Sequence, residues 1–313
     1  ERVKSVKGVS RSLLPLREPV REESLPGATE WTRNVNRSVQ EIGPSDANVL
    51  IYGESGTERF FVARLIVSNS ERKCGPLISL NCSTPPRVLR ATFPRKLKDE
   101  QESAIFGHEY GSAVYAQGWR RGYLDIADSG TLVLEHVEDL VPEVQNRLLE
   151  YLRTSRFCRT GGTQEQTSKV RIIATAIRDL DQMVEQGSFN GELLRLLRDR
   201  SITILPLRER REDIPALTQE FLRRYRRRNQ EVGKLSAGAM GIMVKYDWPL
   251  NFVELNRVIS QAISVSQGRT MREEHIFFDI RDSFKPAGGT DLLRRKWIGR
   301  FLRYRLVPGS LQY

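Results

Sequence analysis

The sequence contains few of the side chains that build metal sites or disulfide frameworks. It has three cysteines and three histidines among 313 residues. Cys74, Cys82 and Cys158 are widely spaced and odd in number, which argues against a disulfide framework and indicates a reduced compartment. Neither a Cys-x-x-Cys nor a His-x-x-x-His spacing occurs, so a structural zinc site is not expected.

Long apolar runs are also missing. No stretch of about 18 consecutive apolar residues occurs, and the first twenty residues carry charged side chains without a continuous apolar segment. A membrane span or a secretory signal is therefore not expected. Apolar residues make up 39% of the chain and the mean hydropathy is -0.45, which is typical of a folded, globular protein.

Positive charge is in excess. Lys and Arg number 50 against 39 Asp and Glu, and the net charge of +11 favours contact with polyanions or anionic lipid surfaces. A dense basic run covers residues 223–228, and residues 291–304 place apolar side chains on one helical face and cations largely on the other. These segments are the candidates for binding a nucleic acid or a membrane surface, although 291–304 also fits a C-terminal helix packed on its own domain or docked on a partner.

Hydrophobic periodicity predicts the α/β class. Short apolar runs that alternate with helical stretches indicate a mainly parallel sheet, covered on both faces. After Pro206 the pattern changes to consecutive helices, which predicts a small helical subdomain. The strands are expected at 47–52, 77–80, 131–134, 170–174 and 202–205, and the helices at 31–42, 141–153, 214–228, 236–245 and 251–266, with Ser236 as an N-cap.

A glycine-bearing turn follows the first predicted strand. The phosphate-binding pattern at such a junction is Gly, four residues, Gly, Lys, and then Ser or Thr. Here Glu58 replaces the second glycine, Arg59 replaces the lysine, and Phe60 removes the hydroxyl that binds Mg²⁺. The turn is therefore either a plain sheet-to-helix connection or a vestigial phosphate loop. Its residues are Gly53, Glu54, Ser55, Gly56, Thr57, Glu58 and Arg59.

Several short phrases occur in a fixed order along the chain. They are PSDANVLI at 44–51, NC at 81–82, FGHE at 106–109, ADSGTL at 127–132, GGT at 161–163, LRERREDIP at 207–215 and YDWP at 246–249. Together they resemble the AAA+ domain of the bacterial sigma-54-dependent transcription activators, over about four-fifths of the chain. The resemblance implies an AAA+ P-loop NTPase-like fold. The expected domains are a linker at 1–24, an α/β subdomain at 25–207, a helical lid at 208–283 and a basic amphipathic tail at 284–313.

The resemblance also assigns catalytic positions, and this sequence departs from the family at them. The acidic pair that holds Mg²⁺ and activates water falls at Glu135 and His136. Glu135 could hold a metal through water if nucleotide binds, whereas His136 is expected to be a poor substitute for the carboxylate because it is no longer a base once protonated, with a role as a novel base as the alternative. The polar sensor pair falls at Ala176 and Ile177, and neither side chain can orient water.

The arginines of the family are changed as well. The two that reach a neighbouring subunit's nucleotide fall at Asn190 and Leu196. Arg195 and Arg198 lie close by, but a one-residue shift turns a helical side chain by about 100°, so we interpret them as a solvated helix face. The lid arginine falls at Val253, which supplies no cation. These changes together imply that hydrolysis is lost while the scaffold persists.

The loop with which the family contacts sigma-54 is changed too. The family's Gly-Ala-Phe-Thr-Gly-Ala corresponds to residues 111–116, where Ala113 and Val114 replace the inserting Phe and Thr, and Tyr115 replaces a glycine. These changes argue against contact with sigma-54. The preceding charged residues, 87–102, are expected to form a surface insertion or a solvated loop.

The sequence thus predicts a catalytically degenerate AAA+ module, a pseudo-ATPase, in the cytoplasm or another reduced compartment. It is expected to act as a regulatory or assembly platform through a protein partner or a homo-oligomer, without a cofactor. The first alternative is an ATP-binding transcription regulator with weak ATPase activity, using ATP and Mg²⁺ through Arg59 and Glu135. The second is a basic module that binds nucleic acid or, through the tail, a membrane surface. No helix-turn-helix is expected, because about two dozen residues follow position 289.

Overall fold

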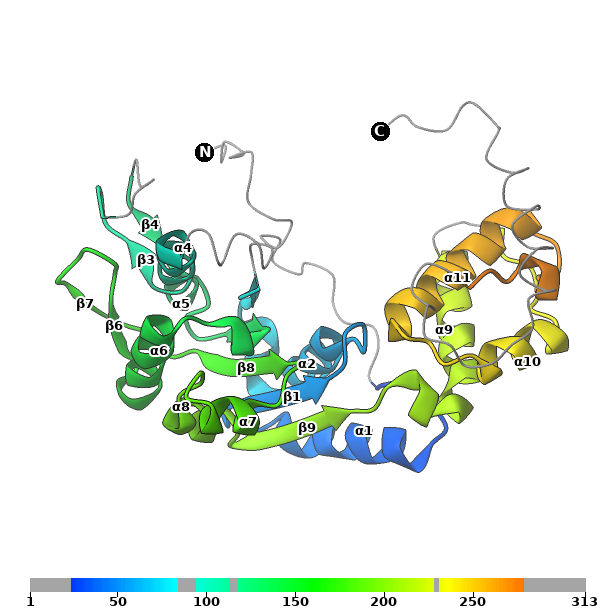
Figure 1. Ribbon diagram of the computed structural model, residues 1–313, viewed down its shortest axis with the longest axis horizontal. Helices are drawn as coiled ribbons and strands as arrows, with labels where there is room; N and C mark the ends of the chain where they lie inside the picture. Colours follow the sequence, from blue (N-terminus) through cyan, green and yellow to red (C-terminus); the bar gives the residue numbers. More distant parts are fainter. Residues whose placement is uncertain (1–23, 84–93, 113–117, 228–230, 279–313) are drawn as a thin grey trace. The chain divides into compact units, whose positions relative to one another are not determined.

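The computed structural model describes residues 24–83, 94–112, 118–227 and 231–278 (Figure 1). The chain divides into two compact units after Phe277, and the second unit lies almost wholly outside the described residues. The predicted linker apart from Ser24, the predicted tail, and the changed positions Ala113, Val114 and Tyr115 also lie outside them. The domain boundaries proposed from the sequence stay predictions.

A five-stranded parallel sheet forms the centre of the first unit, as the sequence predicts. The strand order is β2-β5-β8-β1-β9, and each neighbouring pair is parallel. Every strand lies within two residues of its predicted run. The bounds are Val49–Gly53 for β1, Leu77–Asn81 for β2, Thr131–Glu135 for β5, Arg171–Ala176 for β8 and Arg200–Ile204 for β9.

Alternate residues of the central strands enter two separate cores. Val49 and Ile51 of β1 pack in a core with α1 (Glu30–Ile42) and α2 (Arg59–Ser68), whereas Leu50 belongs to the core on the other face. Successive strand residues point to opposite faces of a sheet, so this sheet is covered on both sides (Figure 1). The second core includes residues of α4 (Pro94–Phe106), α5 (Tyr123–Ile126), α6 (Pro142–Thr154), α7 (Leu180–Glu185) and α8 (Gly191–Leu197).

Helix α4 corrects one prediction. The sequence predicts an insertion or a solvated loop over 87–102, but the chain is helical from Pro94. Gln101 is 5% exposed, and its Nε2 donates to the carbonyls of Cys82 at 3.0 Å and Asp139 at 2.9 Å. Glu102 beside it is 7% exposed and lies 3.5 Å from Nη1 of Arg147, so the end of this charged segment is packed, whereas Glu100 is exposed.

The three helices predicted after Pro206 are present. They are α9 (Ile214–Arg227), α10 (Ala237–Lys245) and α11 (Asn251–Ser266). Ser236 caps α10 as predicted, since its Oγ accepts a hydrogen bond from the N–H of Ala239 at 3.0 Å. None of the helices in the described ranges is long and apolar enough to cross a membrane.

Short antiparallel ribbons and 3₁₀ helices complete the described part. The ribbons are β3 (Gly107–His108) with β4 (Arg120–Arg121) and β6 (Arg156–Cys158) with β7 (Glu165–Thr167), and the 3₁₀ helices are η1 (Glu71–Cys74), η2 (Val137–Asp139), η3 (Leu207–Glu209), η4 (Arg211–Asp213) and η5 (Glu273–His275).

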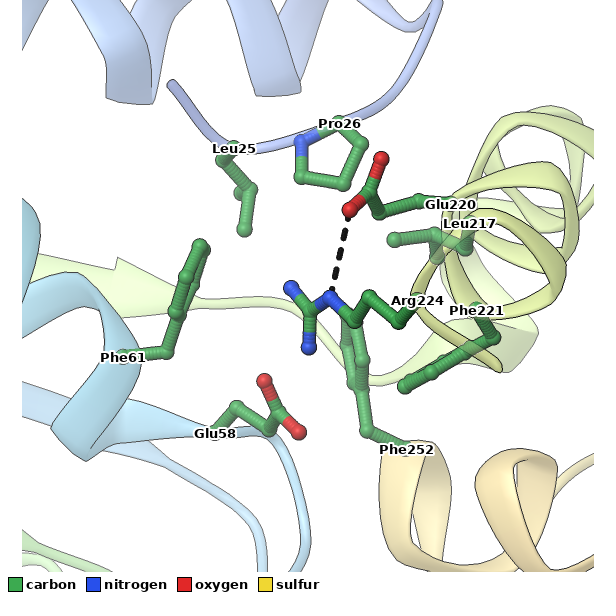
Figure 2. Close-up of a pocket in the computed structure, with 9 residues that line it drawn as sticks. All are labelled: Leu25, Pro26, Glu58, Phe61, Leu217, Glu220, Phe221, Arg224 and Phe252. Carbon is green, nitrogen blue, oxygen red and sulfur yellow. Dashed lines mark hydrogen bonds and ion pairs between the residues drawn. The ribbon is translucent and has the colours of Figure 1, made fainter. Parts of the chain in front are cut away.

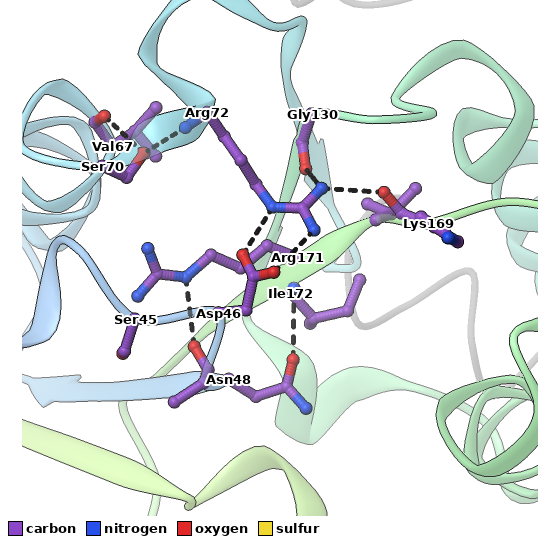
Figure 3. Close-up of polar contacts among 12 residues, drawn as sticks. Ser45, Asp46, Asn48, Val67, Ser70, Arg72, Gly130, Lys169, Arg171 and Ile172 are labelled. Atoms are coloured by element: carbon purple, nitrogen blue, oxygen red, sulfur yellow. Dashed lines mark hydrogen bonds and ion pairs between the residues drawn. The ribbon is translucent and has the colours of Figure 1, made fainter.

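Arg171, at the start of β8, fixes the segment that leads from α1 into β1 (Figure 3). Arg171 is 2% exposed. Its guanidinium donates to the carbonyls of Ile42 and Gly43 at 2.9 Å and of Ala47 at 3.1 Å. Carbonyls at a helix end have no partner within the helix, so this side chain satisfies the end of α1 and holds β1 in place.

Candidate functional site

The loop after β1 lies where an open parallel sheet usually binds ligands. β1 is flanked by β8 and β9, whereas the chain itself continues from β1 to the edge strand β2. Thr57 closes the loop, because its N–H and its Oγ1 both donate to the carbonyl of Glu54, at 3.3 and 2.8 Å. The loop is therefore a defined turn that leads directly into α2.

The guanidinium of Arg59 is directed at the loop itself. Arg59 is 9% exposed, and its Nη1 donates to the carbonyls of Gly53 at 2.7 Å and Glu54 at 2.6 Å. Burial lowers the pKa of Arg59, while the charges of Glu138 and Glu135 act in the opposite direction. A cation at this position of a phosphate loop has to face phosphate oxygens. In this structure it faces backbone carbonyls.

Glu58 adopts the left-handed conformation, with φ 58°, immediately before α2. Glycine supplies this conformation without strain, whereas a residue with a Cβ is disfavoured by roughly 1–2 kcal/mol. Glu58 occupies the position of the second glycine of the phosphate pattern. The loop therefore keeps the turn that glycine usually makes while carrying a carboxylate.

The acidic edge beside the loop comes from the end of β5. The Oε1 of Glu135 accepts a hydrogen bond from the hydroxyl of Ser79 on β2. His136 follows with φ 57°, and its Nδ1 lies 3.4 Å from Oε1 of Glu138. Glu138 is 5% exposed, and the same oxygen accepts the N–H of Ile177 at 3.1 Å. Glu138 is not predicted from the sequence, because its local pattern does not distinguish it from an exposed acid in a turn.

Three predicted catalytic positions carry apolar side chains. Ala176 ends β8 and is fully buried, whereas the Ile177 that follows it is 39% exposed. Val253, on the first turn of α11, is 60% exposed. None of these three side chains can donate or accept a hydrogen bond, so none can orient water or stabilise a phosphoryl group.

The predicted subunit-bridging positions serve the local fold. The Oδ1 of Asn190 accepts hydrogen bonds from the N–H groups of Glu192 at 2.9 Å and Leu193 at 3.0 Å, which caps α8. Leu196 packs against the core, and its carbonyl accepts from Nδ2 of Asn48 at 3.1 Å.

The two arginines beside them differ from each other. The side chain of Arg195 is 71% exposed, as expected of a solvated helix face. For Arg198 that prediction is wrong, because its guanidinium donates to the carboxylate of Asp181 at 2.9 and 2.6 Å and to the hydroxyl of Tyr52 at 2.8 Å. Arg198 therefore ties the end of α8 to α7 and β1.

The helical part of the chain, which begins at residue 208, contacts the loop through an ion pair. Arg208 donates to both carboxylate oxygens of Glu54, at 2.7 and 2.5 Å. The hydrogen bond from Arg208 holds the pKa of Glu54 below its ordinary value. This pair joins two segments that are 154 residues apart in the sequence.

The start of α11 makes further contacts to the loop. Nδ2 of Asn251 donates to the carbonyl of Ser55 at 3.0 Å, and the N–H of Phe252 donates to the carbonyl of Gly56 at 2.9 Å. A Cβ on Gly56 would lie 2.2 Å from the carbonyl oxygen of Leu250. This approach of two backbones is therefore possible only with glycine at position 56.

A cavity of about 10 Å³ remains beside the loop (Figure 2). That volume is close to the space needed by one water molecule. In Figure 2 the side chain of Arg224 extends from α9 into this space, opposite Phe61 and Glu58 of the loop and α2. The lining residues are Leu25, Pro26, Glu58, Phe61, Leu217, Glu220, Phe221, Arg224 and Phe252.

The side chains at this loop differ from those of the phosphate-binding pattern. Arg59 is bound to carbonyls, Glu58 adds a negative charge, and Phe60 has no hydroxyl. Within the described ranges, no group of three or more His, Cys, Asp or Glu side chains is placed to hold a metal ion.

Comparisons with known proteins match both parts of the chain. The family described as "Sigma-54 interaction domain" matches residues 25–203, and that described as "AAA+ ATPase lid domain" matches residues 208–290. The Nif-specific regulatory protein of Herbaspirillum seropedicae is 36% identical over 250 residues, which cover 80% of this chain and 44% of that protein. Regulatory protein AtoC of Escherichia coli is 36% identical over 256 residues, covering 82% and 53%. The chain spans about half the length of the curated relatives it matches.

Among solved structures, NtrX of Brucella abortus in complex with ATP is similar, with a TM-score of 0.74 and 25% sequence identity over 90% of this chain and 61% of that one. The parallel sheet, the loop after β1 and the helices that follow define an AAA+ P-loop NTPase fold. Within that class, the chain belongs to the sigma-54 interaction domain family, as the phrases in its sequence indicate.

Proposed function

We propose that the chain is a catalytically silent member of this family, a pseudo-ATPase that serves as a regulatory or assembly platform. The observation that carries the proposal is the position of Arg59, whose guanidinium donates to the carbonyls of Gly53 and Glu54. Turning this guanidinium toward a phosphate would remove the hydrogen bonds that its Nη1 donates to the two carbonyls. We expect neither ATP nor Mg²⁺ to act as a cofactor.

The other catalytic positions support the same proposal. His136 lies beside the buried acid Glu138, and an imidazole brings no negative charge to the position where the family uses a carboxylate. Asn190 is engaged in capping α8, and Val253 is apolar. Each position thus serves local structure or lacks the chemistry that hydrolysis requires.

The platform role is supported by what the chain retains. The loop and the helical part are joined by protein contacts, Arg208 with Glu54 and Phe252 with Gly56. Such contacts hold the two parts together without a nucleotide, and so keep a defined surface for a protein partner or a second copy of the chain. NtrX, by contrast, was crystallised in complexes with ADP and ATP. Contact with sigma-54 is not part of this proposal, because the inserting residues of the family's loop are changed.

Calorimetric titration with ATP and Mg²⁺, followed by a phosphate-release assay at saturating ATP, tests the proposal. We expect no saturable heat and no release above background. A variant that carries Glu58→Gly, Arg59→Lys, Glu135→Asp and His136→Glu is the matched control, and we expect it to recover nucleotide binding. Tight binding and measurable release by the unaltered chain would instead establish the rival function, a transcription regulator with weak ATPase activity.

The contacts of the basic run give little support to a polyanion-binding function. Arg223 and Arg224 both pair with Glu220, at 2.7 and 3.2 Å. Arg226 donates to the carbonyl of Gly233 at 3.4 Å. These arginines thus have partners within the protein, and the neutralisation of phosphates that drives such binding would compete with them.

We also propose a reduced compartment, the cytoplasm included, for this module. Cys74, Cys82 and Cys158 are all free thiols in the structure. Free cysteines without a disulfide framework are typical of a reduced compartment.

A further inference from the structure

Arg224 lines the cavity beside the loop, and its side chain is 32% exposed. Its Nε lies 3.2 Å from Oε1 of Glu220. Its Cζ lies 5.7 Å from the ring centroid of Phe61 and 5.5 Å from that of Phe221. Figure 2 shows the guanidinium between the carboxyl groups of Glu220 and Glu58, which come from α9 and from the loop.

These surroundings match a cation. Aromatic faces attract a guanidinium at such distances, and carboxylates form its strongest hydrogen bonds. The side chain of Glu220 is 13% exposed and Glu58 is half-buried, so water screens their charges only in part. Among the described residues that line the cavity, Arg224 is the cation, and the others are the two acids and the apolar residues Leu25, Pro26, Phe61, Leu217, Phe221 and Phe252.

The carboxylates of this pocket would repel a polyanion. A triphosphate group beside the loop would face the carboxylates of Glu58 and Glu220, and like charges in a partly buried site repel strongly. The pocket therefore has the polarity of a cation site, reversed from that of a nucleotide pocket.

We propose that this pocket is a receptor for a guanidinium group and that Arg224 is its resident, intramolecular ligand. The inference rests on the proposed loss of nucleotide binding and names the ligand class that the pocket takes in its place. Because Arg224 comes from α9, while Phe61 and Glu58 come from α2 and the loop, occupation of the pocket ties the helical part to the loop. The resident arginine thus holds the two parts together beside the loop.

The test is whether methylguanidinium restores stability to Arg224→Ala. The readout is the Tm for thermal unfolding of the whole chain. Removal of the side chain should lower the Tm and leave a vacant guanidinium site. Methylguanidinium at about 10 mM should then raise the Tm of Arg224→Ala by about 3 °C, saturably, because a ligand that binds the native state stabilises it. Sodium chloride at the same ionic strength should not reproduce the increase.

Arg223→Ala is the matched control. Arg223 is the neighbouring residue on α9 and also pairs with Glu220, at 2.7 Å, but its side chain is 48% exposed and does not line the cavity. Methylguanidinium should leave its Tm, and that of the unaltered chain, unchanged. Adding Glu58→Gln to Arg224→Ala should weaken the rescue, since it removes one of the two carboxylates.

An equal response in Arg223→Ala, or no response in folded Arg224→Ala, would overturn the inference. If Arg224→Ala does not fold, Arg224→Gln, which keeps the stem without the charge, is measured in the same way. Failure of both to fold, with Arg223→Ala folded, would show that Arg224 is a fixed packing residue and not an exchangeable ligand, and would also overturn it. An increase in the Tm of the unaltered chain with ATP would contradict the proposed loss of nucleotide binding instead, so the two failures are distinguishable.

Discussion

Arg208 donates two hydrogen bonds to the carboxylate of Glu54, and the pair fastens the helical part to the loop after β1. The two side chains are 38% and 43% exposed, so the pair contributes at most about 1 kcal/mol. In Arg208→Ala we expect the amide of Phe252, which donates to Gly56, to exchange its hydrogen up to about fivefold faster. Arg195→Ala, which removes an exposed arginine of α8, should leave that rate unchanged.

The same pair should depend on pH. Hydrogen bonding to Arg208 lowers the pKa of Glu54 in the folded state below its ordinary value near 4.5. The stabilisation is therefore fully present above that ordinary value, and it is lost as the pH falls through the lower pKa of the folded state. We expect the difference in Tm between the unaltered chain and Glu54→Gln to be positive at neutral pH and to disappear in acid. A difference that grows as the pH falls would contradict this assignment.

Asn190 should contribute to stability as a helix cap. Its Oδ1 accepts the N–H groups of Glu192 and Leu193, and loss of such a cap costs about 1 kcal/mol. Urea unfolding should therefore show a loss of about that size in Asn190→Ala and little change in Asn190→Asp, which keeps the acceptor. Asn190→Arg, which restores the residue of the family, should also lose the cap. Equal stability of all these variants would show that the cap is not formed.

Substitution of Arg171 should destabilise the fold strongly. Its buried guanidinium makes hydrogen bonds to three carbonyls, so Arg171→Met should lower the free energy of unfolding by about 3 kcal/mol or more. The control is Arg156→Ala, because the side chains of Arg156 and its partner Glu165 are 60% and 57% exposed and such a pair contributes about 1 kcal/mol or less. Denaturant unfolding of both variants checks the contrast, and equal losses would count against it.

The parts of the fold that depend on short-range patterns could be predicted from the sequence. The apolar run Val49 to Ile51 predicted a buried strand, because a strand covered on both faces has no polar positions. Ser236 predicted a helix start, because an N-cap acts over three residues. The ordered phrases predicted the family. Each of these signals can be recognised from residues that are close together in the sequence.

The errors arose where a side chain finds its partner far along the sequence. Arg198 was predicted to be solvated, but its partners come from α7 and β1. Part of the charged segment is helical, with the amide of Gln101 bound to the distant carbonyls of Cys82 and Asp139, where a solvated loop or insertion was predicted. The position of Arg224 beside Phe61 depends on contacts between α9 and α2, which no local pattern records. Charge alone did not distinguish a buried or paired residue from a solvated one.

The most direct test of the central claim is a crystal structure of the chain grown with ATP and Mg²⁺. The account predicts that the guanidinium of Arg59 still donates to the carbonyls of Gly53 and Glu54, with no nucleotide density beside the loop. Density for a triphosphate between Arg59 and Glu135, with the guanidinium of Arg59 turned toward it, would contradict the claim.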